Sequence, residues 1–179
     1  ILQSPAGEGP KLIVDEVAFT KGRVGVDIYF ENPAAGVAGF IINVSDPAPG
    51  ADNFNGYEVA LDPQSKELFI GEHRYDWHLL ERVNCPIGFK EWISLEVELM
   101  DSRILVSVNG KQYLSFKDDT PLTGSQIGLR TWQQTAQFRN LRIKTTDHKQ
   151  SLPFEYESSA DLAKQISGMW SECLEGNVS

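Results

Sequence analysis

Apolar and polar residues alternate along several stretches of this chain. In Arg23–Glu31 (RVGVDIYFE), Val24, Val26, Ile28 and Phe30 occupy every second position. Successive side chains of a β-strand point to opposite faces, so this pattern predicts a strand with one buried face. Similar alternation, or a short apolar run between turn residues, predicts strands in Ala38–Val44, Tyr57–Leu61, Glu67–Gly71, Trp92–Met100, Arg103–Val108, Lys111–Phe116, Ile127–Trp132 and Ala136–Ile143.

Turn residues separate these strands at short intervals. Asn109-Gly110 lies between two of them and predicts a β-hairpin, because a type I′ turn needs positive φ at both central positions. The loop SDPAPGADNFNG after Val44 is long enough to suggest a functional role. About nine to twelve short strands with almost no helix indicate an all-β fold: a two-sheet antiparallel β-sandwich of the jelly-roll or concanavalin-like type.

The stretch Gly124–Ile143 (GSQIGLRTWQQTAQFRNLRI) is the most informative part of the pattern. In its first strand Ile127 and Leu129 point to one face, which we expect to be the core face. Arg130 and Trp132 point to the opposite face, so a guanidinium and an indole lie side by side. This arrangement is expected either in a ligand-recognition surface or in a core where the two side chains fill space.

The alternation ends near residue 146, and this divides the chain into two parts. We expect residues 1–146 to form the sandwich and residues 147–179 to form a short, partly helical C-terminal tail or a linker to a further domain. Ser158 and Ser159 precede Ala160–Ile166, which is compatible with a capped helix. The two cysteines, Cys85 and Cys173, could form one bridge or remain reduced.

Charge and composition restrict the partners. The net charge is −9, and an acidic surface disfavours nucleic acid and anionic membranes. No apolar run approaches the ~18 residues of a membrane span. The first residues, ILQSPAGEGP, are not a signal peptide. The chain therefore looks like a mature or excised piece. We expect the protein to be secreted or extracellular, with the periplasm as an alternative.

Motifs for catalysis or metal binding are weak, so no catalytic residue is predicted. The chain lacks a nucleophile elbow, a phosphate-binding loop, a dinucleotide fingerprint and an HExxH motif. His73 and His78 alone make a poor zinc site. Asp46, Asp52 and neighbouring amides could suit a structural calcium ion, although their spacing matches no known calcium loop. Calcium is thus the one cofactor left open.

Aromatic and planar polar side chains near strand ends suggest sugar recognition. An aromatic ring can cover the C–H face of a sugar, and arginines, carboxylates and amides can pair with its hydroxyls. The candidates are Glu58, Arg74, Trp77, Arg130 and Trp132. The alternative is that the tryptophans fill the core and the arginines pair with surface acids. Glu58 would need a partner if it is covered, and either arginine could supply one.

The order of these segments resembles a known family of binding modules. The segments are GFIINVSD, GYEVALDP, EWISLEVELMDSRILVSVNGKQYLSF and GSQIGLRTWQQTAQFRNLRI, from about Lys11 to Lys144. They resemble the concanavalin/laminin-G-like sandwich and, more closely, carbohydrate-binding module family 66. The resemblance implies ligand-binding roles for Glu58, Arg74, Trp77, Arg130 and Trp132. Where relatives often have an arginine after the GFI strand, this chain has Ile42 and Asn43.

The resemblance also implies a function. Family 66 modules bind the terminal fructofuranose of fructans and are attached to glycoside hydrolases, and related sandwiches accompany arabinofuranosidases. The segment ISGMW is similar to segments that lead into an arabinofuranosidase. We therefore expect a non-catalytic carbohydrate-binding module for arabinan, arabinoxylan or fructan, targeting a linked catalytic domain. The alternatives are a hydrolase of modified disaccharides and a laminin-G-like protein-interaction domain.

Overall fold

The computed structural model describes residues 1–4, 7–14, 17–33 and 35–146. These residues form twelve β-strands, and no helix occurs among them. The strands are β1 (Leu2–Gln3), β2 (Lys11–Val14), β3 (Gly22–Phe30), β4 (Val37–Ser45), β5 (Asn55–Asp62), β6 (Glu67–Arg74), β7 (Trp77–Asn84), β8 (Trp92–Met100), β9 (Arg103–Val108), β10 (Lys111–Lys117), β11 (Gln126–Trp132) and β12 (Ala136–Thr145).

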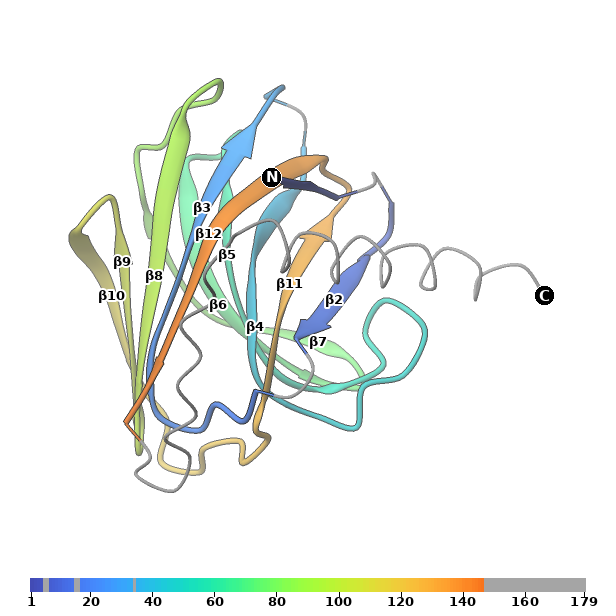
Figure 1. The fold of residues 1–179 in the computed structure, drawn as a ribbon, viewed down its shortest axis with the longest axis vertical. Helices are drawn as coiled ribbons and strands as arrows, with labels where there is room; N and C mark the ends of the chain where they lie inside the picture. Colours follow the sequence, from blue (N-terminus) through green and yellow to red (C-terminus); the bar gives the residue numbers. More distant parts are fainter. Residues whose placement is uncertain (5–6, 15–16, 34, 147–179) are drawn as a thin grey trace.

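The strands make two six-stranded antiparallel sheets that face each other (Figure 1). The first sheet has the order β1-β12-β3-β8-β9-β10, and the second has the order β2-β11-β4-β5-β6-β7. This confirms the predicted two-sheet antiparallel β-sandwich. Neighbouring strands are often distant in the sequence, as where β11 pairs with both β2 and β4. The first residues of the chain therefore contribute an edge strand to each sheet.

The core lies between the sheets and follows the alternation of the sequence. In β3, Val24, Val26, Ile28 and Phe30 are fully buried, as predicted. The second sheet contributes inward-facing side chains from each of its strands, including Leu12, Phe40, Val59, Leu68 and Leu129. Burial of one such side chain contributes about 1.5–3 kcal/mol, so the alternation fixes which face of each strand points inward.

Several strands extend beyond their predicted bounds, as β5 and β6 do, and further strands were not predicted. Lys11–Val14 was not assigned to a strand from the sequence, but it forms β2. Trp77–Asn84 was not predicted as a strand, but it forms the edge strand β7. The predicted Asn109-Gly110 hairpin is confirmed, since their φ angles are 50° and 77°.

The outer face of the second sheet carries a small apolar cluster of its own. Ile41, Val44 and Phe54 are buried there, and Ile13 packs against them. Phe54 belongs to the long loop between β4 and β5. The loop is held by backbone bonds and by Lys11, which donates a hydrogen bond to the carbonyl of Gly50. It therefore folds back over part of this face and brings its polar residues to the sheet.

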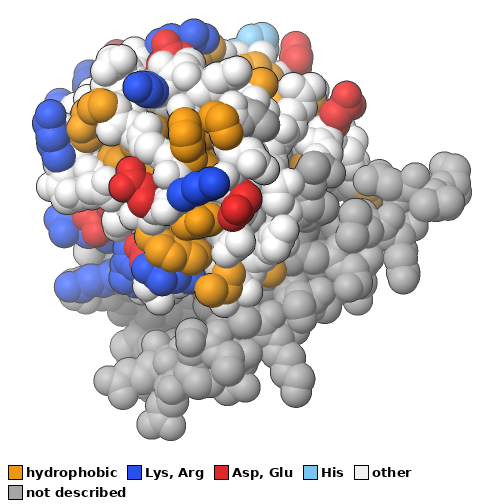
Figure 2. Space-filling view, turned by 90° about the horizontal axis from the view of Figure 1, so that it is seen from above, with side chains coloured by type: hydrophobic (Ala, Val, Ile, Leu, Met, Phe, Trp, Pro, Cys, Tyr) orange, Lys and Arg blue, Asp and Glu red, His pale blue; other side chains and the backbone are white. Residues whose placement is uncertain are grey.

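The molecular surface mixes charges of both signs. Figure 2 shows basic, acidic and apolar side chains interspersed on the face seen from above. Within the part of the chain that the structure describes, no helix is long and apolar enough to cross a membrane. Cys85 is buried in the core. Whether it bridges to Cys173, and the expected tail of residues 147–179, lie outside the described residues.

Candidate functional site

A buried carboxylate marks the outer face of the second sheet. Glu58 lies in β5 between Tyr57 and Val59, which face the core, so its side chain points the other way. Its exposed fraction is only 1%. An unpaired charge at such a position is costly, and the surrounding strands supply its partners.

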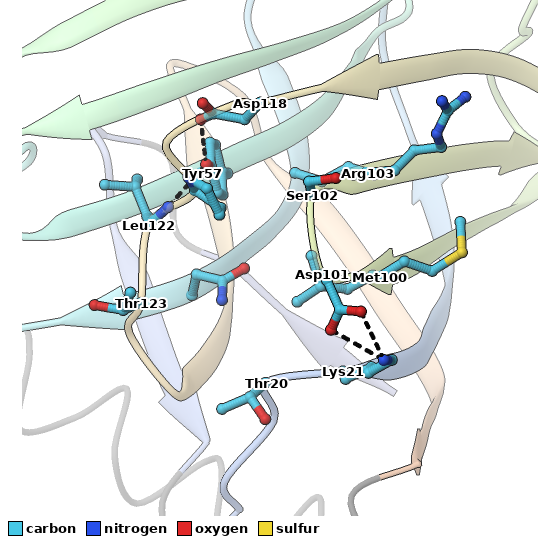
Figure 3. A pocket seen from close by; sticks show the side chains of 14 residues that line it. Thr20, Lys21, Tyr57, Met100, Asp101, Ser102, Arg103, Asp118, Leu122 and Thr123 are labelled. Atoms are coloured by element: carbon cyan, nitrogen blue, oxygen red, sulfur yellow. Dashed lines mark hydrogen bonds and ion pairs between the residues drawn. The ribbon is translucent and has the colours of Figure 1, made fainter.

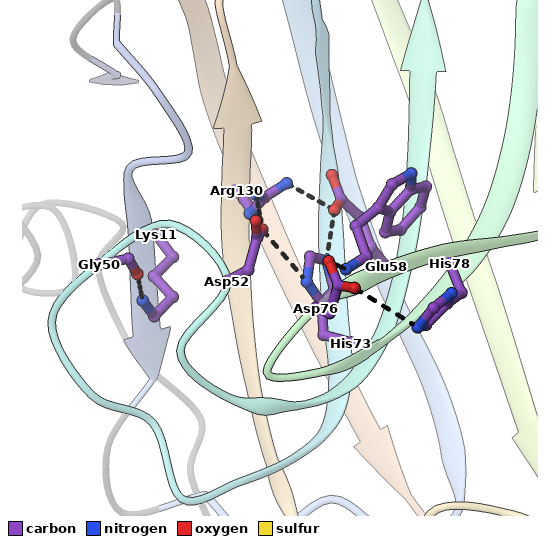
Figure 4. A network of polar contacts seen from close by, with 9 residues as sticks. Lys11, Gly50, Asp52, Glu58, His73, Asp76, His78 and Arg130 are labelled. Carbon is purple, nitrogen blue, oxygen red and sulfur yellow. Dashed lines mark hydrogen bonds and ion pairs between the residues drawn. The ribbon is translucent and has the colours of Figure 1, made fainter.

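Two cations or hydrogen-bond donors converge on the same oxygen of Glu58 (Figure 4). Arg130, from β11, places Nη1 2.6 Å from Glu58 Oε2. His73, from β6, places Nε2 2.8 Å from that oxygen. A carboxylate oxygen can only accept, so Nε2 of His73 carries the donated proton. Arg130 and His73 are both buried, with exposed fractions of 4% and 0%.

Asp52 closes the network from the β4–β5 loop. Its Oδ1 accepts a hydrogen bond from Arg130 Nη2 at 2.9 Å and lies 3.3 Å from His73 Nδ1. The second contact is close, but its geometry is not that of a hydrogen bond. The Asp52 side chain is 32% exposed, so it connects the buried network to solvent. We call Asp52, Glu58, His73 and Arg130 the polar network.

Three buried polar atoms of the network have no hydrogen-bond partner. They are Glu58 Oε1, His73 Nδ1 and Arg130 Nε. Buried polar atoms are usually satisfied, and each exception calls for an explanation such as water or a ligand. Three such atoms in one cluster indicate that this face is built to receive further hydrogen bonds.

The network keeps Glu58 ionised. Burial by itself raises the pKa of a carboxyl group. Here this effect is outweighed by the charge of Arg130 and the hydrogen bond from His73, so the pKa of Glu58 lies below its ordinary value of 4.5. Near neutral pH Glu58 is therefore a fixed negative acceptor with one free oxygen.

Aromatic rings flank the network. The His73 ring is stacked on Phe54, with centroids 4.2 Å apart, and lies 5.0 Å from the Trp77 ring. The Cζ atom of Arg130 lies 5.5 Å from the centroid of Trp132. Both tryptophans are half-buried. The site thus combines hydrogen-bonding groups with indole rings at its margin.

Trp77 reaches this position because residue 71 is a glycine. Gly71 lies opposite Glu58 in the pairing of β5 with β6. A Cβ atom added at Gly71 would lie 1.9 Å from Cη2 of Trp77. No side chain fits into that space, so Gly71 allows the indole to lie flat over the sheet beside the network.

The structure brings together four of the five predicted site residues. Glu58 and Arg130 are bonded to each other, and Trp77 and Trp132 flank them. Arg74 does not join: it is half exposed and pairs with Glu72 at 3.0 Å.

His73 and Asp52 were not among the predicted site residues. Extending the period of two from Gly71 would have placed His73 on the face of Glu58. Asp52 was considered only as a calcium ligand, because its position beside Arg130 depends on how the loop folds back.

The described residues provide no cluster of ligands for the hypothesised calcium ion. Asp52 is held by Arg130, and Asn53 donates to the carbonyl of Pro49. Among the residues that the structure describes, no three His, Cys, Asp or Glu side chains form a group suited to a metal ion.

Comparison with models of protein families identifies the family of this chain. The model of the 3-keto-alpha-glucoside-1,2-lyase-like domain family matches residues 1–144. The chain belongs to this family. The match ends with the last strand, so the sandwich and the family domain coincide over the described residues. A comparison with curated protein sequences found no match.

Solved structures share the fold of this lyase-like domain at low sequence identity. Carbohydrate-binding module CBM66 from Bacillus subtilis is 16% identical with a TM-score of 0.68, over 78% of this chain and 83% of the module. A galectin-like protein of unknown function from Bacillus subtilis is 15% identical with a TM-score of 0.61, over 77% and 79%. Sheep galectin-11, in complex with glycerol, is 9% identical with a TM-score of 0.57, over 77% and 98%. The similarity to the family 66 sandwich, inferred from the sequence, is thus confirmed for the fold.

Proposed function

We propose that this chain is a non-catalytic carbohydrate-binding domain whose ligand sits on the polar network. The observation that carries the proposal is the buried, ionised Glu58 with a free Oε1, held beside two half-buried tryptophans. Sugar hydroxyls can donate to Glu58 and Asp52, while an indole covers a C–H face of the ring. The fold is shared with a carbohydrate-binding module and a galectin, which supports this assignment.

The state of Glu58 favours binding over proton transfer. A general base works best with a pKa near the working pH. Arg130 and His73 hold the pKa of Glu58 below its ordinary value, against the effect of burial. Glu58 is therefore a weak base but a strong hydrogen-bond acceptor, which suits recognition of neutral hydroxyl groups.

The finer proposal is that the ligand is a terminal furanose of arabinan, arabinoxylan or fructan. A compact network with few free atoms fits one sugar ring better than a long chain. The domain would then raise the local substrate concentration for a linked glycoside hydrolase of a secreted protein. The furanose preference rests on the resemblance of the sequence segments to family 66 modules, and the similarity to the solved module supports the shared fold.

A second candidate function is a lyase reaction, which the family match favours. In a 3-keto-glucoside the carbonyl makes the C2 proton acidic. A base would take that proton, and the C–H electrons would form the enolate. The enolate electrons would then form the C1=C2 double bond as the C1–O bond breaks, and the departing oxygen would take the proton back from the base and leave as the alcohol. His73, with a free Nδ1 next to Asp52, is the residue placed to act as the base.

Calorimetric titration tests the binding proposal. Arabinan, arabinoxylan, levan and inulin, each with its matching monosaccharide, are titrated into the wild type and Trp132→Ala. We expect saturable binding to one polymer and its terminal sugar, weakened at least about tenfold, or 1.4 kcal/mol, in the variant. Trp92→Ala is a matched control, because Trp92 is a half-buried indole on the other sheet. Absence of binding to all four polymers contradicts the proposal.

An activity assay separates the two candidates. Methyl 3-keto-α-glucopyranoside is incubated with the wild type and with His73→Ala, and released methanol is measured. The binding proposal predicts no release above the rate in buffer. Catalytic release that is lost in His73→Ala would instead establish the lyase.

A further inference from the structure

A cleft opens at one end of the sandwich, on the side of β5 opposite to the polar network. It encloses about 330 Å³ and draws residues from both sheets (Figure 3). Its walls are the segment before β3, the turn between β8 and β9, and the loop between β10 and β11. Its buried lining includes Tyr57, Leu99 and Ile104.

One wall of the cleft is fixed by hydrogen bonds. The hydroxyl of Tyr57 donates to Asp118 Oδ2 at 2.6 Å and accepts from the backbone nitrogen of Leu122 at 3.0 Å. Asp118 Oδ1 accepts from the backbone nitrogen of Thr120 at 2.8 Å. The β10–β11 loop is therefore held in place before any ligand arrives, and Asp118 retains room for a further donor.

An unpaired acceptor lies in the lining. Asn43 is only 5% exposed and has a φ angle of 50° at an irregularity between β4 and β5. Its Nδ2 donates to the carbonyl of Gly124 at 3.0 Å, which orients the amide. Its Oδ1 is buried and has no hydrogen-bond partner. A buried amide oxygen in a cleft wall is an acceptor ready for a ligand donor.

The charges of the cleft balance. Lys21 pairs with Asp101 at 2.9 Å, and Arg103 and Asp118 add one charge of each sign. Two cations and two anions disfavour a strongly charged ligand. Leu99, Ile104 and other apolar side chains provide contact for C–H groups. Acceptors beside apolar surface match a compound with hydroxyl groups on a carbon ring.

We infer that this cleft is a second binding site, for a neutral polyhydroxyl compound about the size of one sugar ring. Hydroxyls of the ligand donate to Asn43 Oδ1 and to Asp118, while its carbon frame packs on Leu99 and Ile104. The cleft volume lies at the lower end of the range for small-molecule sites. This inference does not depend on the proposed function, because Glu58 points to the opposite face of β5.

Amide-resolved NMR titration tests the inference. The probes are methyl α-D-glucopyranoside, methyl β-D-fructofuranoside and sucrose, each raised to tens of millimolar. We expect saturable shifts at the backbone amides of Ser102 and Leu122 with at least one probe. Trp132→Ala should retain these shifts, which separates this site from the polar network.

Two variants alter the cleft, and a third variant outside the cleft is the control. Thr123→Tyr fills the cleft from an exposed position, and Asn43→Gly removes the amide while tolerating positive φ. We expect binding at least about tenfold weaker in both. Gln112→Tyr adds the same ring on exposed β10, outside the cleft, and should bind like the wild type. If the Ser102 and Leu122 amides stay still with all three probes, or respond equally in Thr123→Tyr, the cleft holds only solvent and the inference is wrong.

Discussion

At Glu58 the chain buries a carboxylate and relies on residues from other segments to compensate it. The partners Arg130 and His73 come from β11 and β6, and Asp52 comes from a loop. Buried ion pairs add little net stability, since desolvation offsets attraction, but the loss of one partner leaves an uncompensated charge. The network is therefore sensitive to single substitutions.

Arg130→Met tests this sensitivity. We expect it to lower the free energy of unfolding by about 3–5 kcal/mol, because Glu58 loses its cation while remaining buried. Urea denaturation measures the effect. The double variant Glu58→Leu/Arg130→Met should recover a large part of the loss.

The matched control is Arg74→Met. This arginine pairs with Glu72 on the surface, so the same substitution should cost about 1 kcal/mol or less. Equal losses of unfolding free energy in Arg130→Met and Arg74→Met would show that burial of the Glu58 pair does not make it more sensitive than a surface pair.

The stability of the domain should also depend on pH through Glu58. Its folded-state pKa lies below 4.5, because Arg130 and His73 outweigh the effect of burial. The group therefore adds stability above pH 4.5, and this contribution is lost as the pH falls through the folded-state pKa. We expect the melting temperature of the wild type to fall in this acid range.

Glu58→Gln isolates that contribution. The acid-range slope of melting temperature against pH should be shallower in this variant. The residual slope reports other carboxyls, including Asp118, whose pKa is also lowered: its hydrogen bonds from Tyr57 and Thr120 outweigh burial. Identical slopes in the two proteins would exclude a lowered pKa at Glu58.

At the scale of the element, β6 and β7 position Trp77. Gly71→Ala places a methyl group where the indole lies, so Trp77 must move away from His73. We expect a change in tryptophan fluorescence and weaker binding of the sugar found by calorimetry. Gly7→Ala is the control, because its added methyl meets only Pro10 at 3.9 Å. An unchanged emission spectrum in Gly71→Ala would contradict this role.

Most individual strands could be predicted from the sequence, because each obeys a local rule. Alternation in Arg23–Glu31 fixes the inward face of β3 without knowledge of its neighbours. The edge strand β7 was missed, since Trp77–Asn84 lacks regular alternation and much of it is exposed. Its pairing with β6 also shifts register beside Gly71, which breaks the period of two.

The candidate site was harder to predict, because it depends on which strands are neighbours. The sequence offered Arg130 and Arg74 equally as partners of Glu58. Only the placement of β4 between β11 and β5 brings Arg130 within reach. Asp52 depends on the path of a loop, for which the sequence contains no local rule.

At the scale of the whole molecule, the first strands protect both sheets. β1 pairs with β12, and β2 pairs with β11 and buries Leu12 in the core. Removing residues 1–14 exposes the backbone hydrogen-bonding groups of both partners. Exposed edges promote pairing between molecules, so we expect a lower melting temperature and self-association.

Light scattering after size-exclusion chromatography measures the association. Removing residues 1–3 is the control, since it uncovers β12 at only two residues. A monomeric protein of unchanged melting temperature after removal of residues 1–14 would show that β2 is dispensable.

The same pairing has a consequence for the order of folding during synthesis. A ribosome releases β1 and β2 early, but their partners β12 and β11 emerge more than a hundred residues later. Until then Leu12 has no core in which to pack. Contacts between distant segments also slow folding, to about milliseconds to seconds for β-sandwiches. We therefore expect the two edges to form last, after β12 has left the ribosome.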